Sequence, residues 1–192
     1  MNLHLLYRIS FFAMLSFLFV SCKTNPIPEK AKAVENFDVN RYLGTWYEIA
    51  RFDFYFEKDL NNTTAQYSLD EKGNLKVLNR GFHVKDKEWK QAEGIAKFRG
   101  EPNVGALKVS FFGPFYSGYN VIALDSAYQY ALVAGKNLDY VWILSREKSI
   151  PEDIKQQYLT LAKEIGYDVS RFIWVEHDQN DSSSVKQEEQ AK

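Results

Sequence analysis

The chain has 192 residues, of which 45% are hydrophobic and 26% are charged, and its formal net charge is −1. This near-neutral balance excludes the strongly basic surface typical of nucleic-acid binding, so we expect no nucleic-acid partner. The chain has one cysteine, which excludes an intrachain disulfide, and its stability has to come from apolar burial.

The first 21 residues are typical of an export signal. Arg8 precedes twelve apolar or small residues, 9–20, and the small residue Ser21 follows them. Twelve residues are too few to cross a hydrocarbon core, which needs about 20. We therefore predict that residues 1–21 are a signal peptide rather than a membrane-spanning helix.

Cys22 follows directly, in a position that resembles the signal peptidase II site of bacterial lipoproteins. Phe19 stands where such sites usually carry leucine. We predict that Cys22 becomes the acylated first residue and anchors the chain to a membrane; ordinary cleavage that leaves a free thiol is the alternative. Lys23 replaces the aspartate of the enterobacterial inner-membrane retention signal, which favours the outer membrane.

The mature chain divides into three parts. Residues 22–33 carry two prolines and several charges and are predicted to be a tether. Residues 34–176 have the patterning of one folded domain. Residues 177–192 are polar and low in complexity, and we predict a disordered tail.

Short alternating segments separated by turn residues fill the domain. We predict strands over 44–51, 63–69, 75–82, 89–98, 106–112, 119–124, 128–134 and 139–146. Eight short strands with hairpin turns between them indicate a sandwich or a barrel. We expect an all-β fold, an eight-stranded antiparallel up-and-down barrel, because this closure leaves no sheet edge and leaves room for one small ligand.

The pattern changes after the eighth strand. Ser149 and Glu152 fit a helix capping box, and Gly166 fits a helix end. Apolar residues fall at helical spacing between them, and we expect this single C-terminal α-helix to pack against the outside of the barrel. Residues 172–175 predict a last strand that covers a barrel edge, and residues 36–38 predict the start of a helical turn over the closed end.

Several stretches resemble the lipocalin family. Its three short conserved regions are matched by Gly44-x-Trp46, by Leu124-Asp125 with Tyr128 nearby, and by Arg146; the second departs from the family's Thr-Asp-Tyr. Longer stretches, 36–51, 108–116 and 118–125, are similar to the bacterial outer-membrane lipoproteins of the family. The resemblance covers residues 22–175.

What this resemblance implies is a carrier of fatty acids or lysophospholipids. It would be anchored in the outer membrane through Cys22, with the periplasmic face expected, and it would have no catalytic residues and no cofactor. Proteins of this type can form homodimers.

Gly44, Trp46 and Arg146 are predicted to close one end of the barrel. A buried arginine is costly unless its donors are paired. Stacking on an indole while donating to nearby carbonyls satisfies it, and the cation–π part contributes roughly 0.5–2 kcal/mol. We therefore expect a structural lid; a role for Arg146 in binding a ligand carboxylate is the alternative.

The inward face of the strands is the predicted ligand cavity. Alternation with period two assigns most inward side chains, whereas both phases of the seventh strand are apolar and leave it unassigned. Small residues and inward phenols favour a hollow interior, and a core filled by its own side chains is the alternative. The predicted cavity residues are Ala50, Leu75, Val77, Leu107, Val109, Phe111, Tyr119, Val121, Tyr140, Trp142 and Leu144.

Phe54, Tyr55 and Phe56 form an aromatic loop where loops are usually polar. They are interpreted as a gate or as a contact surface for a membrane or a second copy, with buried loop packing as the alternative. Four lysines are expected at the open rim, either as headgroup partners or as solvated charges: Lys58, Lys85, Lys87 and Lys136.

The sequence holds no motif for catalysis or metal binding. His4, His83 and His177 lack metal-ligand spacing, and no Gly-x-Ser-x-Gly elbow or phosphate loop is present. We expect no enzyme and no metal. Two rival functions stay open, a carrier of a haem- or bilin-like ligand and a structural envelope lipoprotein with a filled core.

Overall fold

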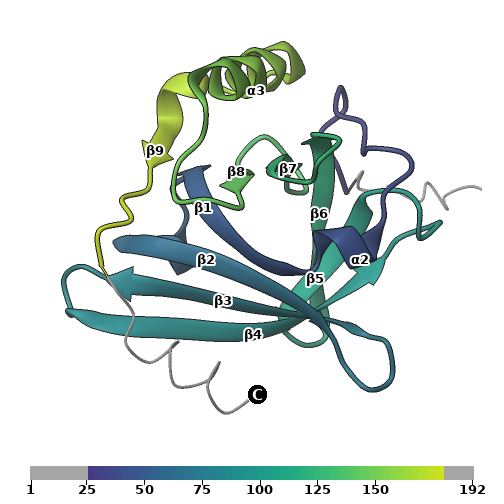
Figure 1. The fold of residues 1–192 in the computed structure, drawn as a ribbon, viewed down its shortest axis with the longest axis horizontal. Coiled ribbons are helices and arrows are strands. Elements are labelled where there is room, and N and C mark those ends of the chain that lie inside the picture. Colours follow the sequence, from purple (N-terminus) through teal and green to yellow (C-terminus); the bar gives the residue numbers. More distant parts are fainter. Residues whose placement is uncertain (1–25, 180–192) are drawn as a thin grey trace, which may run out of the picture.

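The computed structural model describes residues 26–179. Their strands form one antiparallel sheet in the order β2-β3-β4-β5-β6-β7-β8-β1-β9, and β1 also pairs with β2, which closes the barrel (Figure 1). This confirms the predicted eight-stranded antiparallel up-and-down barrel. The barrel strands are β1 (Gly44–Phe52), β2 (Leu60–Leu69), β3 (Leu75–His83), β4 (Glu88–Phe98), β5 (Ala106–Phe112), β6 (Phe115–Leu124), β7 (Tyr130–Ala134) and β8 (Val141–Ser145).

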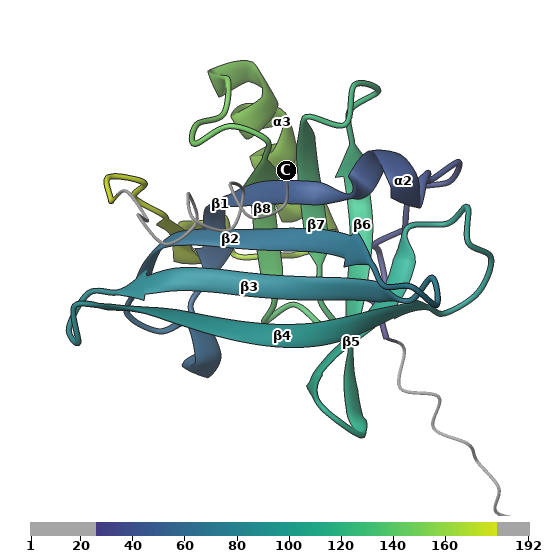
Figure 2. The same ribbon diagram turned by 60° about the horizontal axis from the view of Figure 1, so that its bottom comes forward.

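Hairpins connect consecutive strands, and the longest ones stand out in Figure 2, where β2, β3 and β4 lie side by side and the β5–β6 hairpin extends below them. The β2–β3 turn shows why the chain reverses direction between these strands. Asp70 Oδ1 accepts hydrogen bonds from the backbone N–H groups of Lys72 and Asn74, at 2.9 and 2.7 Å. Gly73 has φ +76°, a conformation that glycine adopts without steric cost.

Within residues 26–179, two α-helices flank the barrel. The short α2 (Val39–Tyr42) begins at Asp38, whose side chain caps Asn40 N, so the predicted helical turn is confirmed. The longer α3 (Glu152–Ile165) lies outside the barrel, and Gly166 ends it in the left-handed region with φ +115°. The predicted capping box is wrong. The box requires Ser149 as the N-cap residue, whereas the helix starts two residues later, with Pro151 as the N-cap and no side chain that caps this end.

The last strand, β9 (Phe172–Trp174), follows the 3₁₀ turn η2 (Val169–Arg171) and completes the wall beside β1. β1 pairs with β2 only from Gly44 to Tyr47, and β9 pairs with the other end of β1, from Ala50 to Phe52. The prediction of a strand that covers a barrel edge is therefore confirmed.

Both ends of the domain extend past their predicted limits. Pro26 O accepts a hydrogen bond from Asn120 Nδ2 at 3.0 Å, and Ala31 is buried, so the predicted tether packs against the barrel from Pro26 onward. At the other end, His177 packs edge-on against Tyr47, and Gln179 N donates to Asn62 Oδ1. The predicted tail therefore begins with packed residues. Residues 1–25, with Cys22 and the predicted leader, and residues 180–192 lie outside the described part of the chain.

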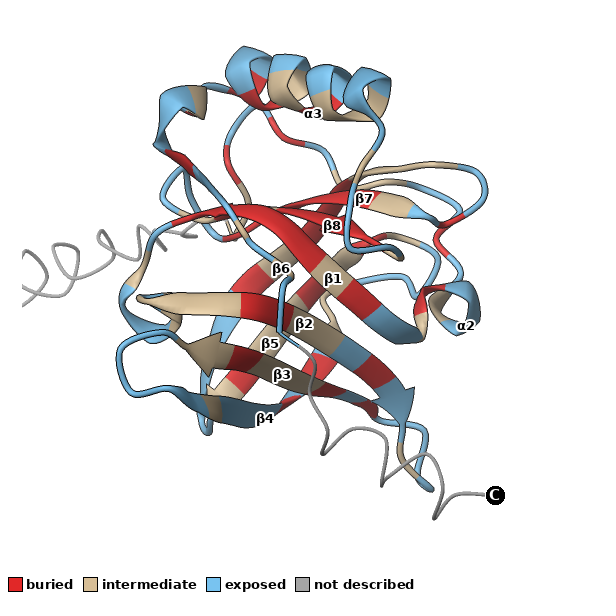
Figure 3. Cartoon of the chain, turned by 60° about the vertical axis from the view of Figure 1, so that its left-hand side comes forward, coloured by how far each residue is buried: buried red, intermediate tan, exposed pale blue. Residues whose placement is uncertain are grey.

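The core has two parts, one on each side of the barrel wall. One lies between the wall and α3 and includes Leu132, Ala134 and Tyr158; the other fills the closed end around Trp46 and includes Ala131 and Val133. Buried residues accordingly gather on β1, β7 and β8 beneath α3 (Figure 3). β7 faces a hydrophobic environment on both sides, which explains why its pattern was apolar in both phases.

Candidate ligand-binding cavity

The closed end is built from β1, β8 and α2. Trp46 is fully buried, and the Arg146 guanidinium carbon lies 3.9 Å from the centroid of its ring. Arg146 donates to Thr45 O at 2.8 Å and to Arg41 O at 2.9 Å, and its Nε donates to a third carbonyl, that of Tyr128. Its donors are thus used by carbonyls of the closed end rather than aimed at a ligand.

Gly44 lies next to Arg146 in a backbone conformation that favours glycine. Its φ is +91°, and a Cβ atom there would be in ordinary contact with Arg146 Nη1, at 3.4 Å. A larger residue at position 44 would therefore be strained by its backbone angle.

A cavity of about 650 Å³ occupies the barrel interior. Such a volume is typical of a site that buries most of a small ligand. The loops around residues 53–59, 84–87, 113–114 and 135–140 surround the end opposite Trp46, which is the mouth. Nine of the eleven predicted cavity residues line it, namely Leu75, Val77, Leu107, Val109, Phe111, Tyr119, Tyr140, Trp142 and Leu144.

The other two predicted cavity residues, Ala50 and Val121, do not line it. β1 has a register shift between Glu48 and Ala50, so the alternation changes phase: Glu48 pairs with Leu144, and Arg51, not Ala50, pairs with Trp142. Ala50 consequently packs in the cluster under α3. Val121 is fully buried in the cluster at the closed end. A bulge of this kind cannot be read from a period-two pattern.

The aromatic loop at the mouth divides between two environments. Phe54 lines the cavity, and its ring centroid lies 5.6 Å from that of Tyr140 and 5.8 Å from that of Trp142. Tyr55 and Phe56, in the 3₁₀ turn η1 (Tyr55–Glu57), are 86% and 67% exposed, and Phe56 also borders the cavity. Phe54 is thus half-buried against other rings, whereas a gate or contact role for Tyr55 and Phe56 stays a prediction.

The rim lysines also differ from one another. Lys136 lines the cavity, and its Nζ lies 6.0 Å from the Tyr140 ring centroid. Lys58, Lys85 and Lys87 do not line it. Lys85 instead forms an exposed ion pair with Asp59 at 2.7 Å.

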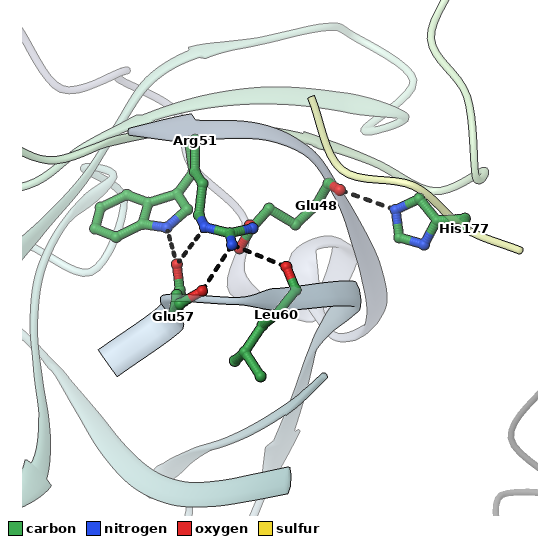
Figure 4. A network of polar contacts seen from close by, with 6 residues as sticks. Glu48, Arg51, Glu57, Leu60 and His177 are labelled. Carbon is green, nitrogen blue, oxygen red and sulfur yellow. Dashed lines mark hydrogen bonds and ion pairs between the residues drawn. The ribbon is translucent and has the colours of Figure 1, made fainter. Parts of the chain in front are cut away.

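A buried charged network, which the sequence reasoning missed, forms one wall of the cavity (Figure 4). Arg51 Nη1 donates to Glu48 Oε1 at 2.7 Å, and Arg51 Nε lies 3.6 Å from Glu57 Oε2. Arg51 Nη2 donates to the backbone oxygens of Glu57 and Leu60, and Trp142 Nε1 donates to Glu57 Oε2 at 3.1 Å. The Arg51 side chain is only 2% exposed.

The network holds two carboxylates and one guanidinium, and this imbalance changes their acidity. Burial and the nearby charge of Glu48 raise the pKa of Glu57 to about 8, against the opposing effect of Arg51. Burial also raises the pKa of Glu48, despite its contact with Arg51. The network therefore retains a proton at neutral pH.

Three phenols meet on the cavity surface. Tyr67 Oη donates to Tyr119 Oη at 2.7 Å, and the hydroxyls of Tyr42 and Tyr119 also lie 2.7 Å apart. Burial raises the pKa of all three, so they are neutral donors. Alternation within the predicted strand 63–69 would have pointed to Tyr67, whereas Tyr42 comes from a helical turn and gave no such signal.

Residues 26–179 contain no group of three or more histidine, cysteine, aspartate or glutamate side chains that could hold a metal ion. Within the same residues, no helix combines the length and the apolar character needed to cross a membrane.

Comparisons with known proteins agree with this geometry. A family model described as a lipocalin-like domain matches residues 37–177. The outer membrane lipoprotein Blc of Escherichia coli (strain K12) is 54% identical over 85% of this chain and 93% of that protein. The protein of the same name from Citrobacter freundii is 52% identical over 83% of this chain and 90% of its own length.

Among solved structures, apocrustacyanin C1 has the same fold, with a TM-score of 0.65 at 18% identity over 84% of this chain and 96% of that one. The resemblance seen in the sequence is thus confirmed, and the chain belongs to the lipocalin family.

Proposed function

We propose that this protein is an outer-membrane lipoprotein that carries one fatty acid or lysophospholipid molecule in its barrel. The observation that carries the proposal is the cavity of about 650 Å³, closed by Trp46 and open at the aromatic mouth. Lipocalin-like domains are binding proteins rather than enzymes. The relatives named outer membrane lipoprotein support a lipid anchor in the outer membrane, which we assign to Cys22. The periplasmic face is our own expectation for the domain.

The energetics of transfer favour a carrier over a permanent store. Burying sixteen methylene groups gives roughly 13 kcal/mol relative to water, at ~0.8 kcal/mol each. A lipid that leaves a bilayer gives up about the same amount, so the net transfer free energy is small. Chain length is then discriminated weakly, and the contacts of the headgroup select the ligand.

Lipid displacement tests this function directly. The packing contacts of the barrel are made within residues 26–179, so a chain from Lys23 to Lys192 retains the whole domain without its anchor. Purified and delipidated, it should bind a fluorescent fatty acid that oleic acid or oleoyl lysophospholipid displaces. Lipid extracted from the freshly purified protein should consist of single-chain species. Absence of displacement would overturn the proposal, and a visible absorbance band would indicate a haem- or bilin-like ligand instead.

The same proposal includes a membrane contact at the mouth. Pro26 O packs against Gly118, where a Cβ atom would lie 2.2 Å from it, and Gly118 lines the cavity. The chain from Cys22 to Pro26 spans at most about 14 Å. An acylated Cys22 therefore holds this side of the mouth near the bilayer surface, where exposed aromatic side chains are favoured: Tyr55, Phe56, Phe112, Phe115 and Tyr116.

Vesicle binding by the unacylated chain tests this contact. The triple substitution Tyr55→Ser, Phe56→Ser and Phe115→Ser should reduce sedimentation with phosphatidylethanolamine–phosphatidylglycerol vesicles. The matched control is Trp174→Ser, a half-exposed aromatic residue on β9 whose ring lies under Lys155 of α3 and does not line the cavity. If the triple variant sediments like the unsubstituted chain, the contact is wrong. If it loses self-association instead, these residues form the surface for a homodimer.

A further inference from the structure

The cavity wall formed by β1 and η1 presents two carboxyl groups and no cationic group to the interior. Glu48 and Glu57 both line the cavity, whereas Arg51, which lies between them, does not. The guanidinium is thus behind the two carboxylates as seen from the cavity. A ligand group that reaches this wall meets carboxylate oxygens first.

A polar atom without a partner lies on β3. Asn79 Oδ1 is buried without a hydrogen bond to any described residue, and Asn79 lines the cavity. A buried acceptor that stays unsatisfied is unfavourable, so this atom favours a ligand that donates a hydrogen bond.

The aromatic side chains beside the carboxylates favour the same kind of group. Trp142 donates to Glu57, its ring is stacked with that of Tyr140 at 6.4 Å, and Phe54 meets both rings edge-on. Aromatic faces attract cations, and the attraction grows when water is excluded.

We propose that Glu57 is the binding subsite for an ammonium group of the ligand, so that among single-chain phospholipids the preferred ones carry an aminoalkyl headgroup. The proposal rests on the lipid-carrier function and deepens it. The ammonium group donates to the Glu57 carboxylate and lies among the aromatic rings. Lys136, one of the cationic side chains that line the cavity, is available to the phosphate.

Occupancy of this subsite has a second consequence. With a pKa of about 8, Glu57 is mostly protonated at pH 7 in the empty cavity, under the combined influence of Glu48, Arg51 and Asp53. A bound ammonium group favours the ionised carboxylate. The O–H bond of Glu57 then breaks and the proton leaves to solvent, so binding at pH 7 should release close to one proton.

Two ligands that share an oleoyl chain and differ only in their headgroup distinguish binding at the Glu57 subsite from binding of the acyl chain in the cavity. The chain 23–192 should bind lysophosphatidylethanolamine about tenfold more tightly than lysophosphatidylglycerol, the difference expected for one charge-assisted hydrogen bond. Calorimetry in buffers of different ionisation enthalpy should show proton release for the first ligand only. Equal affinities, or no proton release, would overturn the subsite even though the cavity binds lipid.

Glu57→Gln should reduce the preference to within about twofold and abolish the proton release, with the affinity for lysophosphatidylglycerol kept. The matched control is Glu93→Gln, an exposed carboxylate on the outer face of β4, which should leave both quantities unchanged. A preference that persists in Glu57→Gln contradicts the proposal. Should that variant fail to fold, the proton release of the unsubstituted chain decides. If neither lipid binds, the carrier function itself is wrong.

Discussion

Two arginines, one at each end of the barrel, are paired in opposite ways. Arg146 at the closed end lies on Trp46 and donates to the carbonyls of Thr45 and Arg41. Arg51 near the mouth contacts the carboxylates of Glu48 and Glu57 as well as two carbonyls. The first cation is compensated by neutral groups that do not titrate. The second is overcompensated by two acids that compete for it.

The closed end is therefore structural, whereas the end near the mouth can change its protonation. Neutral partners keep the lid in the same state at any physiological pH and with or without a ligand. The acid pair near the mouth keeps a proton that a change of pH or an incoming cation can remove. The predictions below test whether stability depends on the first end and binding on the second.

The largest effect is expected at the closed end. Trp46→Ala should lower the free energy of unfolding by about 3–5 kcal/mol, because it removes a fully buried indole and leaves Arg146 without its aromatic partner. Chemical denaturation measures this loss. Trp174→Ala, at a half-exposed position, is the control and should cost far less. Similar losses for the two variants would contradict the assignment of Trp46 as the lid.

Filling the cavity should reduce binding with little loss of stability. Val109→Trp places a large ring in the space for the acyl chain, and the affinity for a fluorescent fatty acid should fall about tenfold or more, as expected when roughly two methylene contacts are lost. Lys108→Trp, one residue away in β5 and directed to the outside, should leave the affinity unchanged. Unaltered affinity in Val109→Trp would place the ligand elsewhere.

The sequence was sufficient to predict the strands, the lid and most of the cavity, because alternation and turn residues are local signals. β5 was predicted with its observed bounds, 106–112. The assignment failed where a single residue breaks the period. The register shift in β1 turned Ala50 outward and brought Arg51 next to the cavity wall, and no local pattern marks such a bulge.

Contacts between segments that lie far apart in the sequence were the other feature that could not be predicted. Glu57 becomes a wall residue because η1 folds back onto Arg51 and Trp142, 6 and 85 residues away. Pro26 packs on β6 through a carbonyl group, which carries no side-chain signature. The composition of that segment was typical of a linker, so only its tertiary contacts could show that it is ordered.

The pH dependence of stability tests whether the carboxyl groups near the mouth retain a proton. The pKa of Glu57 rises from 4.5 when unfolded to about 8 when folded, so the folded state binds more protons between these values. Stability therefore falls as the pH rises through this window, by about 1 kcal/mol between pH 7 and pH 9. Denaturation at several pH values measures the slope. Glu57→Gln should reduce the slope, because it removes one of the two buried carboxyl groups with a raised pKa, whereas an equal slope in that variant would assign the proton to another group.

The smallest effect is expected within the aromatic loop, where neighbouring residues have opposite environments. Tyr55→Ser should change the free energy of unfolding by no more than about 0.5 kcal/mol, because the side chain is 86% exposed. Phe54→Ser should cost clearly more, since it removes the contacts with Tyr140 and Trp142. Vesicle binding should respond in the reverse order. If both substitutions affect stability and vesicle binding alike, the loop acts as one unit, and its division into a cavity wall and a contact surface is wrong.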